Sequence, residues 1–159
     1  MALKLVDIDD RLIHGQVATT WIPDYGIESA IIVSDAGAND PVQESVAGLA
    51  APNIKVTVFG VEKFIDVLKK TQLKKATMVL FTNPIDALTL KKNGLDYNYL
   101  NVSGMRFNDQ RTRLHKNMSV TKEEKEAFEE LIGMGVECWM QTTTRDSKEP
   151  VAELLKNFQ

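Results

Sequence analysis

The sequence lacks the features that mark several classes of protein. Its 159 residues include one cysteine, Cys138, which has no partner for an internal disulfide and is typical of a reducing compartment. Its strongest apolar runs, Ala30–Val33 and Met78–Phe81, are far shorter than the roughly 20 residues that span a bilayer. Lys4 and Asp7 interrupt the start of the chain, which argues against a secretory signal. We therefore expect a cytoplasmic protein.

Positive charge is not in excess either. The chain has 19 Lys and Arg against 22 Asp and Glu, a net charge of −3, which gives no reason to expect a nucleic-acid partner. Two histidines and one cysteine do not make a metal-ligand set, so we expect no metal and no cofactor. The sequence has no P-loop motif, so ATP is not the expected source of a phosphoryl group.

What the chain does have is the composition and patterning of one α/β domain. Hydrophobic residues make up 43% and charged residues 26%, and the length suits a single domain over residues 1–159. Short β-rich runs alternate with helical patterns, which predicts a predominantly parallel central sheet with helices on both faces, in three layers. Strands are expected at 3–8, 27–34, 54–59, 76–81, 99–102 and 136–142, and helices at 15–21, 41–50, 61–70, 84–94, 121–133 and 150–158.

Helix signals support this order and locate the ligand-binding edge. Asp40 and Asn83 each stand before a proline, and Thr121 with Glu124 has the spacing of a capping box. In parallel sheets, ligands bind outside the carboxyl ends of the strands. Four segments are therefore expected to meet at that edge: 9–16, 35–40, 82–84 and 101–111.

The segment after the first strand carries the strongest chemical pattern. His14 is placed at a helix start, where free backbone N–H groups favour a neutral imidazole and can hold phosphate oxygens. Arg11 adds a cation whose forked geometry suits phosphate, and Asp10 is expected to accept from the ring and set its tautomer. Gly15 leaves the approach to the ring open, and Gly15 and Gln16 are expected to contact phosphate. This set suits a histidine that accepts a phosphoryl group and passes it on.

From the residues alone, two other interpretations stay open. A histidine near a helix start is often only a surface or capping residue, which would make the chain a binding or regulatory module. A stand-alone histidine phosphatase or mutase-like enzyme also forms phosphohistidine. That class usually has arginine directly before the histidine, where this chain has Ile13, and it needs a second histidine, for which only His115 is available.

The amino-acid sequences of three segments resemble those of a known family. DDRLIHGQVATTW at 9–21, LFTNP at 80–84 and LNVSGMRF at 100–107 resemble the EIIB component (type 4) of the mannose/fructose/sorbose class of bacterial phosphotransferase systems. The resemblance implies that His14 accepts a phosphoryl group from EIIA on Nδ1 and transfers it to a sugar. The activity would be that of a protein-Nπ-phosphohistidine–sugar phosphotransferase. Arg11 would assist transfer, and Asp10 would shape the loop.

The resemblance also implies partners. The phosphoryl donor would be the EIIA phosphocarrier, and the sugar would enter through the membrane components EIIC and EIID, with which the protein would associate peripherally from the cytoplasm. Mannose, fructose, sorbose and N-acetylgalactosamine all remain as substrates. Relatives often pair, so a homodimer is a further expectation.

One departure from the family pattern concerns positive charge. Many relatives carry an arginine three residues after the acid at Asp40, where this chain has Gln43. If transfer needs a second cation, the remaining candidates are Arg106, Arg111 and Arg113.

Further residues are expected to line the pocket of His14. They are Asp35, Asn83, Ser103 and Arg111, although a cap or turn role is an equal alternative for Asp35 and comes first for Asn83. The basic stretch 111–116 is expected to be a solvated loop, with a docking surface for an acidic partner as the alternative.

Overall fold

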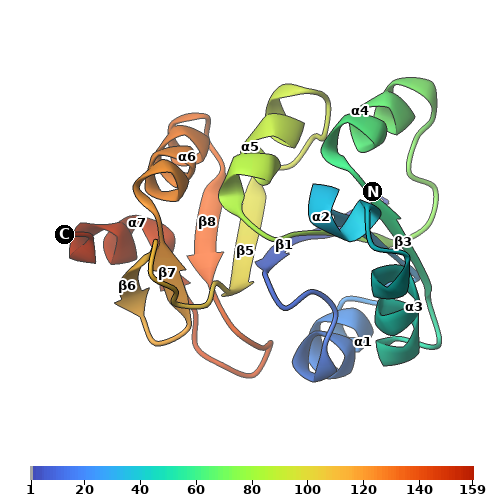
Figure 1. The fold of residues 1–159 in the computed structure, drawn as a ribbon, viewed down its shortest axis with the longest axis horizontal. Coiled ribbons are helices and arrows are strands. Elements are labelled where there is room, and N and C mark those ends of the chain that lie inside the picture. The colour runs from blue at the N-terminus through green and yellow to red at the C-terminus, as the bar shows by residue number, and fades with distance from the viewer. Residues whose placement is uncertain (1) are drawn as a thin grey trace.

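The computed structural model describes residues 2–159, and they form a layered α/β fold around one sheet (Figure 1). The sheet has seven strands in the order β3-β2-β4-β1-β5-β8-β9. All neighbours pair in parallel except β8 and β9, which pair antiparallel. The strands are β1 Leu3–Asp9, β2 Ser29–Val33, β3 Lys55–Phe59, β4 Thr77–Phe81, β5 Tyr99–Gly104, β8 Glu137–Met140 and β9 Glu149–Pro150. A separate antiparallel hairpin joins β6 Thr112–His115 to β7 Met118–Val120.

Helices cover both faces of the sheet, which confirms the expected three-layer arrangement. Those in the described chain are η1 Val17–Trp21 (a π-helix), α1 Ile22–Asp24, α2 Asp35–Ala38, α3 Pro41–Ala50, α4 Val61–Lys70, α5 Pro84–Lys92, α6 Lys122–Gly133, α7 Val151–Leu154 and η2 Leu155–Asn157 (a 3₁₀-helix). One apolar core packs η1, α1 and α3 against the sheet, and a second core packs α4, α5 and α6 against its other face.

The helices begin at the residues that the sequence signals predict. The side chains of Asp40 and Asn83 accept from Val42 N–H and Asp86 N–H, so each caps a helix that starts at proline. Thr121 and Glu124 form the reciprocal capping box at the start of α6. These caps fix where the connecting loops leave the carboxyl edge of the sheet.

The stretch 111–116 is not a solvated loop, so that expectation was wrong. Residues 112–115 form β6, in which Leu114 is buried and packs with Met118 and Val120 of β7. The basic residues around Leu114 concealed the strand pattern, because the hairpin buries only part of its side chains. The short elements α2 and β9 were also not predicted; they contain too few residues to show a periodicity.

Strand β1 lies at the centre of the sheet and carries two buried acids on one face. Asp7 and Asp9 are both fully buried, and alternation puts them on the same side as Leu5, towards η1 and α3. The Asp7 carboxyl lies 2.7 Å from Ser103 Oγ and accepts from Asn101 Nδ2 at 2.9 Å. Burial raises the pKa of the Asp7 carboxyl to about 8, so this group is largely protonated at neutral pH.

The substitution Asp7→Asn keeps the shape of the side chain but removes its titration. Folding raises the pKa of Asp7 from 3.8 to about 8. The stabilisation linked to this shift is therefore fully present below pH 3.8 and is lost as the pH rises towards 8. We expect the unfolding free energy of the wild type to fall relative to Asp7→Asn across this range, by at most about 1.4 kcal/mol per pH unit. Urea unfolding at several pH values measures the difference in unfolding free energy between the two proteins. A difference that does not change with pH would contradict a protonated Asp7.

Candidate functional site

The candidate site is the loop that follows β1, and it is organised around Asp9. Asp9 Oδ2 lies 2.7 Å from His14 Nε2, while Asp9 Oδ1 accepts from the backbone N–H of Arg11 at 3.0 Å and from Arg11 Nε at 3.3 Å. The Asp9 side chain is 1% exposed, whereas His14 is 24% and Arg11 38% exposed. A buried acid therefore holds two functional groups that both reach the surface.

The backbone folds back on itself to make these contacts. Leu12 has a φ of 63°, in the left-handed region, and its N–H bonds to the Asp9 carbonyl at 3.0 Å. This conformation is costly for any residue with a Cβ and is held by the surrounding contacts. It brings His14 back over the end of the strand.

The contact with Asp9 selects one tautomer of His14. A carboxylate can only accept, so Nε2 carries the hydrogen and Nδ1 keeps its lone pair. Nδ1 is the nitrogen available for attack on phosphorus.

A helix begins directly after His14. The His14 carbonyl accepts from Ala18 N–H at 2.9 Å, so the N–H groups of Gly15, Gln16 and Val17 precede the first helical bond. A Cβ at Gly15 would meet no atom within 4 Å outside its two chain neighbours. The helix then widens into the π-turn η1, an arrangement that is frequent at functional sites.

Asp10 does not contact the His14 ring, so its expected role in setting the tautomer was wrong. Its carboxylate faces the other way and pairs with Arg106 Nε at 3.1 Å and with Arg111 Nη1 at 2.7 Å. Asp10 therefore ties the His14 loop to the segment after β5. Sequence reasoning missed Asp9, although the alternation of Leu5, Asp7 and Asp9 on one face of β1 was a usable signal.

The three arginines expected to supply a second cation are engaged elsewhere. Arg106 and Arg111 share Asp10, and Arg111 also bonds to Glu124 at 2.9 Å. The guanidinium of Arg113 lies over the Phe107 ring at 5.1 Å. None of these contacts places an arginine beside His14.

The expected pocket-lining residues are dispersed. Asp35 accepts from Val61 N–H at 2.8 Å and so joins α2 to α4. Ser103 is fully buried against Asp7 rather than lining a pocket, because β5 runs through the interior. Asn83 and Arg111 do share a cavity with Asp10, of about 450 Å³, beside α5 and α6.

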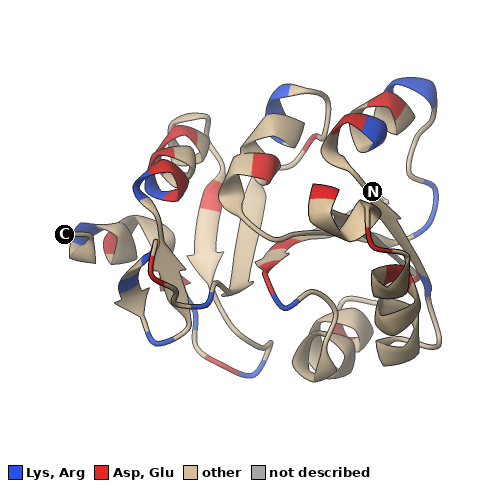
Figure 2. Ribbon diagram, viewed as in Figure 1, with Lys and Arg blue, Asp and Glu red and all other residues tan. Residues whose placement is uncertain are grey.

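Arg11 lines two cavities. The first, of about 320 Å³, is lined by Leu12, Val42, Gln43 and Val46, so position 43 presents a neutral amide beside Arg11. The second, of about 390 Å³, has a largely polar lining of Gln16, His115, Lys116, Asn117, Met140, Thr142, Asp146, Ser147 and Glu149. Figure 2 shows one basic segment on the loop after β1 and another at the turn of the β6–β7 hairpin, both below the arrowheads of β1, β5 and β8.

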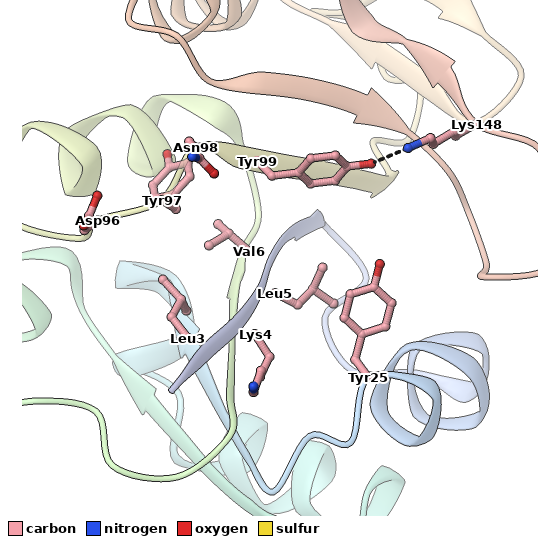
Figure 3. Close-up of a pocket in the computed structure, with 10 residues that line it drawn as sticks. All are labelled: Leu3, Lys4, Leu5, Val6, Tyr25, Asp96, Tyr97, Asn98, Tyr99 and Lys148. Atoms are coloured by element: carbon pink, nitrogen blue, oxygen red, sulfur yellow. Dashed lines mark hydrogen bonds between the residues drawn. The ribbon is translucent and has the colours of Figure 1, made fainter. Parts of the chain in front are cut away.

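A third cavity lies away from the site. Figure 3 shows that it is lined by the first half of β1, by residues 96–99 and by Tyr25 and Lys148. Lys148 is 3.1 Å from the hydroxyl of Tyr99 and lies over the ring of Trp139 at 4.4 Å. Because Asp9 ends β1 at the opposite edge, this cavity does not belong to the His14 site.

His115 is unsuited to be a second phosphoryl carrier. Its Nδ1 accepts from Asn117 N–H at 3.1 Å, and its Nε2 lies 2.8 Å from Glu149 Oε2. Both ring nitrogens are therefore occupied, and the histidine phosphatase alternative loses the second histidine that it requires.

Two further observations concern the whole described chain. Across residues 2–159, no three His, Cys, Asp or Glu side chains are grouped so that they could hold a metal ion. None of the helices found there has the length and apolar character needed to cross a bilayer.

Known proteins resemble this chain along nearly its whole length. Residues 3–159 match the family model for the PTS system sorbose subfamily IIB component. The fructose-specific EIIB component of Bacillus subtilis is 35% identical, with 99% of this chain and 98% of that protein covered. The mannose-specific EIIAB component of Escherichia coli is 35% identical over 99% of this chain and 50% of that protein. The crystal structure of the IIBSor domain of the Klebsiella pneumoniae sorbose permease has a TM-score of 0.91 at 34% identity, covering 100% of this chain and 99% of the other.

The role of Asp9 can be tested without any partner. In wild type at alkaline pH, ¹⁵N NMR of the His14 ring should show hydrogen on Nε2 and a bare Nδ1. Asp9→Asn should give a mixture of tautomers, because an amide can donate as well as accept. Asp7→Asn, a buried acid on the same face of the same strand, is the matched control and should leave the spectrum unchanged. Hydrogen on Nδ1 in the wild type would contradict the assignment.

Proposed function

Since this chain belongs to the sorbose subfamily of phosphotransferase-system IIB components, and so is a phosphotransfer component of a sugar-uptake system, we propose that His14 Nδ1 is its phosphoryl acceptor. The observation that carries the proposal is the 2.7 Å contact between Asp9 Oδ2 and His14 Nε2. It keeps the ring in the tautomer whose Nδ1 lone pair is free.

The donor in this proposal is a phosphohistidine of the EIIA component. Nδ1 of His14 forms a bond to phosphorus while the nitrogen–phosphorus bond on the donor breaks, and the electron pair of that bond stays on the donor ring. No proton has to move in this step. The fusion of EIIA to EIIB in the mannose component of E. coli supports this choice of partner.

Arg11 and the start of the helix stabilise the charge that develops on the phosphoryl oxygens. The guanidinium of Arg11 is anchored by Asp9 and still 38% exposed, so part of it can face an incoming phosphate. The N–H groups of Gly15 and Gln16 lie at the positive end of the helix that follows.

The second transfer delivers the phosphoryl group to a sugar at EIIC and EIID on the cytoplasmic side of the membrane. The nitrogen–phosphorus bond breaks, its electron pair returns to Nδ1, and the sugar oxygen bonds to phosphorus. The proton of the sugar hydroxyl passes to Nδ1, whose lone pair is restored when the nitrogen–phosphorus bond breaks. Relatives named for fructose and mannose support a hexose as acceptor. A single domain over residues 1–159 and a homodimer stay predictions.

Labelling tests the acceptor directly. With labelled phosphoenolpyruvate, the two general relay proteins and the EIIA half of the E. coli mannose protein, wild type should gain acid-labile, base-stable phosphate. His14→Ala should gain none, because it lacks the nucleophile. Phosphoramidate, which phosphorylates histidine without a partner, serves as a second donor if the heterologous EIIA is not recognised. Label that maps to the peptide around His115 instead of His14 would overturn the assignment.

Gly104 offers a way to displace Arg11 without changing its charge. A Cβ at position 104 would lie 3.0 Å from Arg11 Nη2, at the far end of a flexible side chain. We expect Gly104→Ala to move the guanidinium and slow phosphoryl uptake on the order of tenfold, with little change in the urea midpoint. Gly48→Ala, where a Cβ meets nothing within 4 Å, is the control and should match the wild-type rate. Equal rates for both variants would exclude a role for the position of Arg11.

A further inference from the structure

The phosphoryl group carried by His14 meets an unfavourable charge balance in the loop itself. A phosphoryl group brings about −1.5 to −2 charges at neutral pH. It would sit on a ring that is already in contact with the Asp9 carboxylate. Arg11 balances only part of this charge, because its Nε already lies 3.3 Å from Asp9 Oδ1. A second cation would stabilise both the carrier state and the transfer.

One lysine is placed to supply that charge. Lys116 lines the same cavity as Arg11 and Gln16, and it forms no ion pair with any residue in the range 2–159. The arginines near the loop differ from it, since Arg106 and Arg111 are held by Asp10.

The backbone that carries Lys116 is anchored on both sides. Lys116 and Asn117 form the turn of the β6–β7 hairpin. On one side of Lys116, His115 Nε2 lies 2.8 Å from Glu149 Oε2. On the other, Asn117 Nδ2 donates to Thr142 Oγ1 at 3.0 Å. The turn is therefore fixed against β8 and β9, while the Lys116 side chain stays free to extend into the cavity.

The other charged groups of the cavity are already hydrogen-bonded within their own surroundings. The Glu149 carboxylate is in contact with His115. The Asp146 carboxylate accepts from the N–H of Thr143 at 3.0 Å and from its hydroxyl at 2.9 Å. Neither carboxylate lies within ion-pair distance of Lys116, whose charge is available to an anion that enters beside Arg11.

We propose that Lys116 is a second phosphate-binding cation of this site, whose ammonium group contacts an oxygen of the phosphoryl group on His14 across the cavity. Lys116 keeps its protons and makes no bond to phosphorus, so it contributes charge only. A lysine is a compact charge on a flexible stem and can follow the phosphoryl group without clamping it, which suits a carrier that must release its load. The inference rests on the proposed function of His14.

The test uses the whole chain and phosphoramidate, and it needs no partner protein. The variants are Lys116→Gln, Lys116→Arg and the control Lys74→Gln, an exposed lysine before β4 at the opposite edge of the sheet. ³¹P NMR follows the ionisation of the phosphoryl group on His14. In Lys116→Gln the titration midpoint should rise by a few tenths of a pH unit and uptake should slow roughly three- to fivefold, as expected for one exposed charge. Lys116→Arg should restore both values.

The outcomes separate this inference from the function on which it rests. If Lys116→Gln titrates and reacts like wild type while His14→Ala gives no phosphoryl signal, Lys116 is not part of the site and the carrier role stands. If the titration midpoint shifts equally in Lys116→Gln and Lys74→Gln, the effect comes from the net charge of the protein alone, and the inference is also overturned. If wild type shows no phosphoryl resonance on His14, both the inference and the proposed function fail.

Discussion

The arrangement of the site depends on one buried carboxylate, that of Asp9. It stands at the end of the central strand and bonds at once to the His14 ring, to the Arg11 guanidinium and to the Arg11 backbone. A buried acid is costly unless it is paired and hydrogen-bonded, so these contacts are strongly favoured over any alternative loop geometry. The contacts that make the burial of Asp9 tolerable therefore also orient His14, the proposed nucleophile, and Arg11, and the loop that makes them has a left-handed backbone at Leu12.

Three acids in one short segment have different roles because they face different surroundings. Asp7 is enclosed beside Ser103, and burial raises the pKa of its carboxyl to about 8, so it adds little charge near the site at neutral pH. Asp9 serves His14 and Arg11. Asp10 joins the loop to Arg106 and Arg111. Asp7 and Asp9 share one face of β1, but only Asp9, at the end of the strand, reaches the His14 ring.

The carrier role proposed for His14 requires a site that two partners can reach in turn. His14 meets this requirement because its ring is supported from below and stays 24% exposed. Arg11, beside it, also lines two cavities of about 390 and 320 Å³. In the proposed carrier role, such a partly exposed site would hold phosphate through a few charges and backbone N–H groups, which stabilises the group without enclosing it.

The sequence by itself determined the fold class, the order of the main strands and helices, the helix caps and the segment that carries His14. Those features follow from local periodicity, from capping side chains and from one family-specific motif. Only the tertiary structure decided which of two adjacent acids orients His14, that Arg106 and Arg111 are held by Asp10, and that Lys116 shares a cavity with Arg11. These facts depend on which way each side chain points and on contacts between residues about a hundred positions apart, for which a single sequence holds no local signal.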